Sequence, residues 1–165
     1  MIKLELLRKK QENYGPAFEE HILEQYKLYI EMADRISARR MLANSFFLGV
    51  HTSLLALLSL FFKENQQEPT IIWLAPLFAV ILLCFVWWRI VYSYRQLNSG
   101  KFKVIHKIEQ MLPIAPYEEE WKELGCGKDS NLYKPLTSIE NWPPVCFAIL
   151  YLFLSVSLLT IYCNG

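Results

Sequence analysis

Residues 42–62, LANSFFLGVHTSLLALLSLFF, form an apolar run of 21 residues without an Asp, Glu, Lys or Arg. As a helix this run reaches roughly 31 Å, which matches the hydrocarbon core of a bilayer. Two further apolar runs follow, IIWLAPLFAVILLCFVWW at residues 71–88 and PPVCFAILYLFLSVSLLTIYC at residues 143–163. We therefore predict an all-α membrane protein with three transmembrane helices.

Tryptophans stand near the ends of these runs, at Trp73, Trp87, Trp88 and Trp142. Indole rings favour the headgroup level of a bilayer, so we expect these four residues to mark the membrane interfaces.

The Lys and Arg residues are distributed very unevenly between the connecting segments. Residues 1–41 and 89–142 carry eight each, residues 63–70 carry one, and the residues after 163 carry none. Because basic loops are retained in the cytoplasm, residues 1–41 and 89–142 are predicted to be cytoplasmic. Residues 63–70 become a short external loop, and the C-terminus is external.

A heptad-like seam precedes the first apolar run. It consists of Ile22, Tyr26, Tyr29, Ala33 and Ile36, at intervals of four and three residues. No Gly or Pro interrupts residues 17–48. We predict one long N-terminal helix from Ala17 to Phe62 that extends into the cytoplasm. The seam packs either against the chain's own cytoplasmic helices or against another subunit.

The second cytoplasmic segment is predicted to be a helical loop region. Asn98-Ser99-Gly100 is typical of a helix stop, and residues 101–112 have the pattern of a separate amphipathic helix. Residues 117–124, YEEEWKEL, indicate a short acidic helix that ends at Gly125. Thr137 and Glu140 have the spacing of a capping box before the third span.

Small residues at four-residue spacing, Ser45, Gly49 and Ser53, form a stripe on the first span. Such stripes allow helix backbones to approach closely in lipid, and we interpret this one as a helix-packing face. Asn44 and His51 are intramembrane polar candidates. We expect the imidazole of His51 to be neutral and bonded to a neighbouring Ser or Thr, because the spans offer it no charged partner.

Arginines cluster where the spans meet the cytoplasmic segments, at Arg35, Arg39, Arg40 and Arg89. They are typical of a collar that reaches lipid phosphates. Arg40 lies on the seam, and its alternative partner is a cytoplasmic acid among Glu118, Glu119 and Glu120.

The sequence contains no recognisable catalytic triad, metal motif or phosphate loop, so we predict a non-enzymatic protein without a metal or cofactor. The four cysteines have no zinc spacing, and the net charge of +1 argues against nucleic acid as a partner. An enzyme would require a polar cluster at the cytoplasmic interface, for instance Asp34, Arg40, Asn44 and Glu140 around a lipid headgroup.

Two long segments carry a resemblance to a known family. Residues 26–48, YKLYIEMADRISARRMLANSFFL, and residues 94–144 around KFKVIHKIEQMLPIAPYEEEWKEL are similar to the RipA family of octameric bacterial membrane proteins. The resemblance implies a homo-oligomer, an octamer, in the bacterial cytoplasmic (inner) membrane, with a periplasmic C-terminus. It implies no catalytic residues.

The preferred function is therefore a homo-oligomeric scaffold or ring, whose partners are copies of itself and membrane lipids. The alternative is a channel-like or membrane-perturbing effector of stress or defence, which predicts toxicity and loss of membrane potential. A pore would need a polar stripe along a span, and Asn44, His51, Thr52 and Ser59 are a weak candidate for one.

Overall fold

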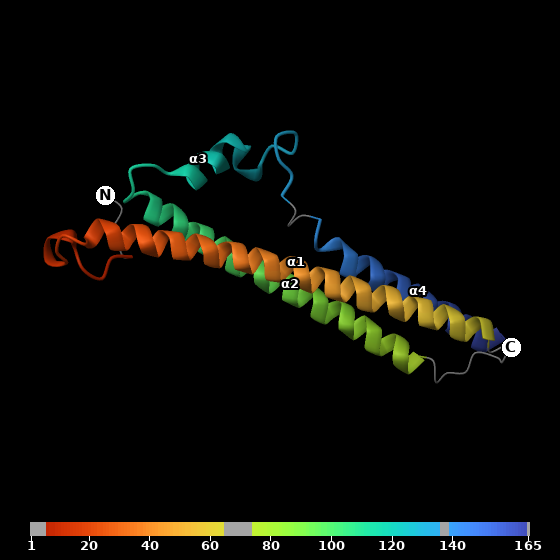
Figure 1. The fold of residues 1–165 in the computed structure, drawn as a ribbon. Coiled ribbons are helices and arrows are strands. Elements are labelled where there is room, and N and C mark those ends of the chain that lie inside the picture. The colour runs from red at the N-terminus through yellow and green to blue at the C-terminus, as the bar shows by residue number, and fades with distance from the viewer. Residues whose placement is uncertain (1–5, 65–73, 136–138, 165) are drawn as a thin grey trace. The chain divides into compact units, whose positions relative to one another are not determined.

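The regular structure of the chain is helical. The computed structural model describes residues 6–64, 74–135 and 139–164. Its elements in these ranges are η1 (Gln11–Asn13), α1 (Phe18–Glu64), α2 (Leu74–Glu109), α3 (Pro116–Glu123), η3 (Gly125–Gly127) and α4 (Trp142–Asn164) (Figure 1). Three of them, α1, α2 and α4, are long and apolar enough to cross a membrane. The predicted all-α class with three long apolar helices is confirmed.

The chain divides into two compact units. We call the first the polar unit, and it consists of Met1–Ala38 and Gln96–Lys134. The second is the apolar unit, Arg39–Arg95 and Pro135–Gly165, which contains the membrane-spanning lengths of helix. Helices α1 and α2 contribute to both units, whereas α3 belongs to the polar unit and α4 to the apolar unit.

Helix α1 is continuous over 47 residues, as the sequence predicts. It begins after Gly15, whose φ of +102° ends the preceding turn, and the N–H of Phe18 donates to the carbonyl of Gly15. No Pro follows within the helix, so no residue lacks the N–H that the hydrogen-bond ladder needs, and the single glycine, Gly49, does not interrupt the ladder.

Helix α2 corrects one prediction. It runs without a break from Leu74 to Glu109, so Asn98-Ser99-Gly100 does not end it and residues 101–109 are no separate helix. Gly100 is a weak helix former, but Ile105 and Ile108 beyond it are buried against α1. Tertiary packing on both sides of the glycine outweighs its local preference.

Helix α3 confirms the short acidic helix at residues 116–123, and it ends where Gly125 adopts a left-handed conformation with φ of +63°. Helix α4 places Pro143 and Pro144 in its first turn, where proline is tolerated. The external loop from residue 65, Trp73 and the proposed capping residue Thr137 lie outside the described residues.

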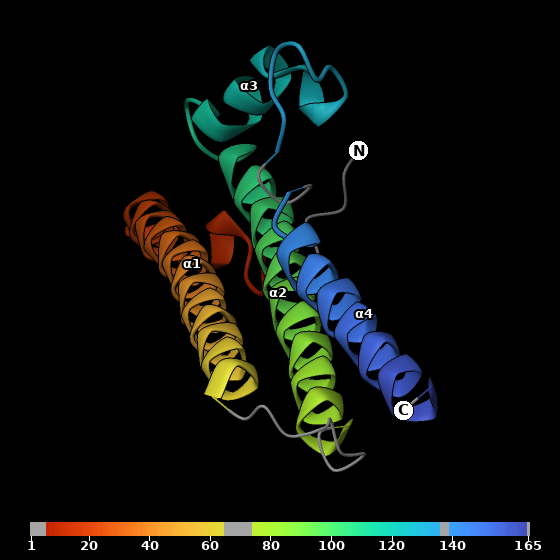
Figure 2. The ribbon, with the colours of Figure 1, turned by 90° about the vertical axis from the view of Figure 1, so that its right-hand side faces the viewer.

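Each unit has its own hydrophobic core. In the polar unit, Ile22, Tyr26 and Ala33 of α1 pack with Ile105 and Ile108 of α2. In the apolar unit, α1, α2 and α4 each contribute a length of helix (Figure 2). Two clusters join these helices, one around Leu77, Val80, Cys84 and Tyr151 and one around Phe47, Trp87 and Val91.

We expect Gly125→Ala to destabilise the turn after α3. A Cβ at this position would lie 3.3 Å from both the Cβ of Asp129 and the Cδ1 of Leu132, and the positive φ disfavours any L side chain. The cost should be about 1 kcal/mol, seen as faster amide hydrogen exchange in residues 120–128. Glu120→Ala, at an exposed position of α3, is the control and should leave exchange unchanged.

Candidate functional site

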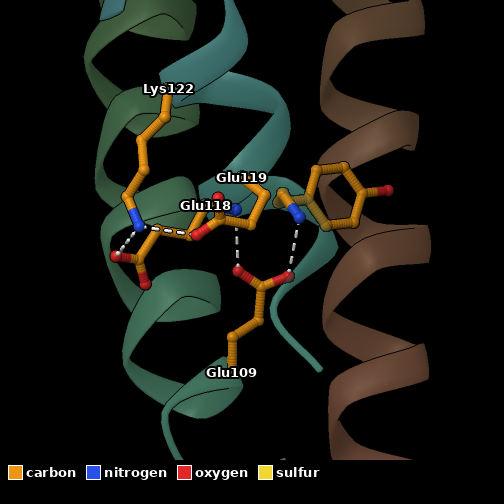
Figure 3. A network of polar contacts seen from close by, with 5 residues as sticks. Glu109, Glu118, Glu119 and Lys122 are labelled. Carbon is orange, nitrogen blue, oxygen red and sulfur yellow. Dashed lines mark hydrogen bonds and ion pairs between the residues drawn. The ribbon is translucent and has the colours of Figure 1, made fainter. Parts of the chain in front are cut away.

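A buried carboxylate, Glu109, organises the polar unit. It is only 1 % exposed and accepts a hydrogen bond from the hydroxyl of Tyr26 at 2.8 Å. It also accepts from the backbone N–H groups of Tyr117 at 2.9 Å and Glu118 at 3.1 Å (Figure 3). These N–H groups belong to the first turn of α3, so the last residue of α2 caps the next helix.

The same network fixes Tyr26 in its protonated form. Burial, reinforced by the hydrogen bond to Glu109, raises the pKa of the Tyr26 phenol well above its usual range. On the outer side of α3, the ammonium of Lys122 contacts Glu119 at 2.6 Å and Glu118 at 3.1 Å (Figure 3). Hydrogen bonds to Glu119 and Glu118 raise the pKa of Lys122.

The predicted seam on α1 faces inward within the polar unit. Ile22, Tyr26, Ala33 and Ile36 are buried, and Tyr29 is half-buried beneath the ammonium of Lys101, 4.4 Å from its ring centroid. The seam therefore packs largely against the chain's own α2. A role for these residues in contact between subunits stays a prediction.

A pocket of about 180 Å³ opens beside this seam in the polar unit. Its lining residues are Ile30, Ala33, Asp34, Ser37, Phe102, Ile105 and Tyr117. Ser37 donates its hydroxyl hydrogen to the backbone carbonyl of Ala33 at 3.2 Å. The lining is mainly apolar, with Asp34 as its charged member.

The intramembrane polar candidates face other helices of the apolar unit. The side-chain oxygen of Asn44 accepts from the indole N–H of Trp87 at 2.9 Å. His51 is fully buried, with its Nδ1 3.2 Å from the hydroxyl of Tyr151 and its Nε2 3.7 Å from the sulfur of Cys84. The Tyr151 hydroxyl also donates to the backbone carbonyl of His51 at 3.3 Å.

This arrangement corrects one prediction. The partner of His51 is a tyrosine on α4 and not a Ser or Thr, because its ring points between helices while Thr52 bonds to the backbone of its own helix. Trp87 is 1 % exposed and packs between Phe47 and His51, and its place at a membrane interface stays a prediction. The four residues considered for a pore-lining stripe do not share one surface. Asn44 and His51 point inward, whereas Thr52 and Ser59 are exposed.

Arg40 pairs with Glu140 at 3.3 Å between its Nε and a carboxylate oxygen, and their side chains are 10 % and 15 % exposed. The proposed pairing with Glu118, Glu119 or Glu120 is therefore wrong. The two charges are close, yet neither the Nε nor the Nη1 of Arg40 makes a well-aligned hydrogen bond. Coulomb attraction therefore holds this pair more than hydrogen bonding does.

The other collar residues and the small stripe lie on the outside. Arg39 and Arg89 are exposed, and Arg35 is exposed and paired with Glu31 on the same helix. Ser45, Gly49 and Ser53 are exposed, and nothing lies within 4 Å of a Cβ built on Gly49. A helix that packs closely on this stripe must therefore belong to another molecule or to residues outside the described ranges. The role of the stripe as a helix-packing face stays a prediction.

The sequence analysis missed Glu109, Cys84 and Tyr151. A hydroxyl in the middle of an apolar run was the available signal for Tyr151. An acid four residues before the helix-ending Pro113 was the signal for Glu109. Of the four residues considered for an enzyme, the structure joins only Arg40 and Glu140. Asn44 is occupied by Trp87, and Asp34 belongs to the polar unit.

The polar groups described here connect helices within each unit. All four cysteines are free thiols, and in the described part of the chain no three His, Cys, Asp or Glu side chains gather where they could hold a metal ion. Hydrogen bonds join α1 to α2, α1 to α4 and α2 to α3, and an ion pair joins α1 to Glu140, just before α4. They position helices relative to their neighbours within each unit.

We expect Glu109→Ala to release α3. The substitution leaves two backbone N–H groups and the Tyr26 hydroxyl without their acceptor, at a cost of about 2 kcal/mol to local stability. Hydrogen exchange of residues 116–123 should accelerate. Glu119→Ala removes an exposed carboxylate from the same helix and should leave the first-turn amides protected, since equal acceleration in both variants would contradict the capping role.

We expect Glu140→Gln to destabilise the apolar unit by about 3 kcal/mol, because it leaves the buried Arg40 charge uncompensated. The double variant Arg40→Met with Glu140→Leu should recover most of this loss. Thermal unfolding of the detergent-solubilised protein measures both. If the single variant is as stable as the unchanged protein, the pair does not contribute as the geometry indicates.

The model of one family, described as the Octameric membrane protein family (8xMP), matches residues 23–160, which is most of the chain. The resemblance is confirmed at the level of an octameric membrane family, and this description does not include the name RipA. No curated protein and no solved structure matches the chain.

Proposed function

This chain belongs to the Octameric membrane protein family (8xMP), and we propose that eight copies of it form a non-enzymatic ring in the bacterial cytoplasmic membrane. In this assembly the apolar lengths of α1, α2 and α4 lie in the lipid. Residues 1–41 and 89–142 lie in the cytoplasm, and the C-terminus is periplasmic. The ring acts as a scaffold, with lipid around its outer surface.

One observation from the structure carries the assembly. Leu28 and Met32 of α1 are 58 % and 48 % exposed, although they lie among the charged residues of the polar unit. Lipid tails cover apolar side chains only in the spans, so these two residues need a protein partner to leave water. A neighbouring copy of the chain provides that partner in an octamer.

The small-residue stripe supports the same assembly. Ser45, Gly49 and Ser53 lie at intervals of four residues on the first span, and all three are exposed. Residues four apart are neighbours on one face of a helix. The stripe is therefore free to contact a second copy.

The channel-like alternative receives less support. Asn44 and His51, its best pore-lining candidates, are engaged by Trp87 and Tyr151 between helices of one chain. A water-filled pore needs such groups on a free surface. The alternative predicts ion flux through protein-containing vesicles, whereas the scaffold predicts none.

The subunit count tests the proposal. Native mass spectrometry from mild detergent should give a complex with eight times the chain mass of 19.4 kDa. Gly49→Leu should reduce the octamer fraction severalfold if close helix approach is required, because a bulky side chain then separates the backbones. Leu152→Ala, at an exposed position of α4, is the control. A monomer in the unchanged protein would overturn the proposal.

A further inference from the structure

The exposed face of α1 in the polar unit combines acidic and apolar side chains. Glu24, Leu28, Glu31 and Met32 are all exposed. Both glutamates pair only along their own helix, Glu24 with Lys27 at 2.9 Å and Glu31 with Arg35 at 2.5 Å. In both ion pairs, more than half of each side chain is exposed. Solvent therefore screens the two pairs, and a new partner can replace Lys27 or Arg35 at little cost in free energy.

The exposed face of α2 in the same unit is basic. Lys103 and Lys107 are exposed and lie four residues apart, so they occupy one face of the helix. Among the described residues neither lysine forms an ion pair with an acid of the chain. Two lysines without partners and two weakly paired glutamates are thus presented by different helices of the unit.

These charges lie at matching heights along the helices. Helices α1 and α2 run antiparallel here, because Tyr26 contacts Glu109 while Tyr29 contacts Lys101. Both helices rise by the same distance per residue, so the two contacts fix which residues lie at equal heights. Lys103 lies at the level of Glu31 and Lys107 at the level of Glu24, each within about one helical turn.

We propose that the exposed face of α1 that carries Glu24 and Glu31 in one subunit packs against the basic face of α2 in the next subunit. The inference rests on the proposed ring. All copies in a membrane ring share one orientation, so groups at equal height meet. Glu31 then faces Lys103, Glu24 faces Lys107, and the contact covers Leu28 and Met32. Because two different surfaces meet, the contact is head-to-tail, which is the kind that closes a ring.

A contact of α2 against α2 is disfavoured by charge. In a membrane ring such a contact would bring the two copies together with Lys103 and Lys107 at the same heights, where like charges repel. The basic face of α2 therefore needs a different surface as its partner, and this requirement gives the ring its direction.

A charge-reversal cycle tests the contact. Glu31→Lys with Glu24→Lys should abolish the octamer in native mass spectrometry and light scattering, and so should Lys103→Glu with Lys107→Glu. All four substitutions in one chain should restore it. Reversing Glu120 and Lys128, two exposed charges beyond these faces, is the matched control and should leave eight subunits.

Cross-linking provides a second test that does not depend on the folding of the reversed variants. In a background where the exposed Cys126, Cys146 and Cys163 are all replaced by Ser, chains with both Glu31→Cys and Lys103→Cys should form a covalent ladder on oxidation, and either substitution alone should not. A ladder from Glu31→Cys alone, or octamers that survive the charge reversals, would overturn the contact while leaving the ring intact. A monomeric unchanged protein would overturn both.

Discussion

The absence of water inside a bilayer is the constraint on which this architecture depends. A backbone N–H or C=O in the hydrocarbon region finds a partner only within its own helix or sheet, and a single apolar segment satisfies all of them only as a helix. The three apolar runs therefore become α1, α2 and α4. Hydrophobic burial contributes little to the contacts between them, because lipid tails are as apolar as leucine.

Specific contacts between the helices must then come from shape and from a few polar groups. Two hydrogen bonds of this kind join helices of the apolar unit. The indole N–H of Trp87 donates to the side-chain oxygen of Asn44, and the hydroxyl of Tyr151 bonds to the ring of His51. Each such pair is satisfied only in one register of the two helices. The polar residues inside the spans therefore act as register markers for a core that apolar side chains alone would define poorly.

The extent of the helices could be predicted from the sequence better than the partners of individual side chains. The seam from Ile22 to Ile36 and the lack of Gly or Pro identified α1, because both are local and periodic signals. The stop expected at Gly100 failed, because packing of Ile105 and Ile108 overrode a local preference. The partners of His51, Arg40 and Glu109 lie on other helices, and a single sequence does not reveal how antiparallel helices are aligned.

The start of α4 has a consequence for how a chain enters lipid. A helix begins with four N–H groups that have no partner in the ladder, and exposing them to hydrocarbon is costly. Here the N–H of Trp142 bonds to the carbonyl of Ile139, and Pro143 and Pro144 have no amide hydrogen at all. Two of the four positions that open the helix therefore carry no donor that needs a partner. Tandem imino acids thus take the place of a capping side chain, and they lower the dehydration penalty at this end of the segment.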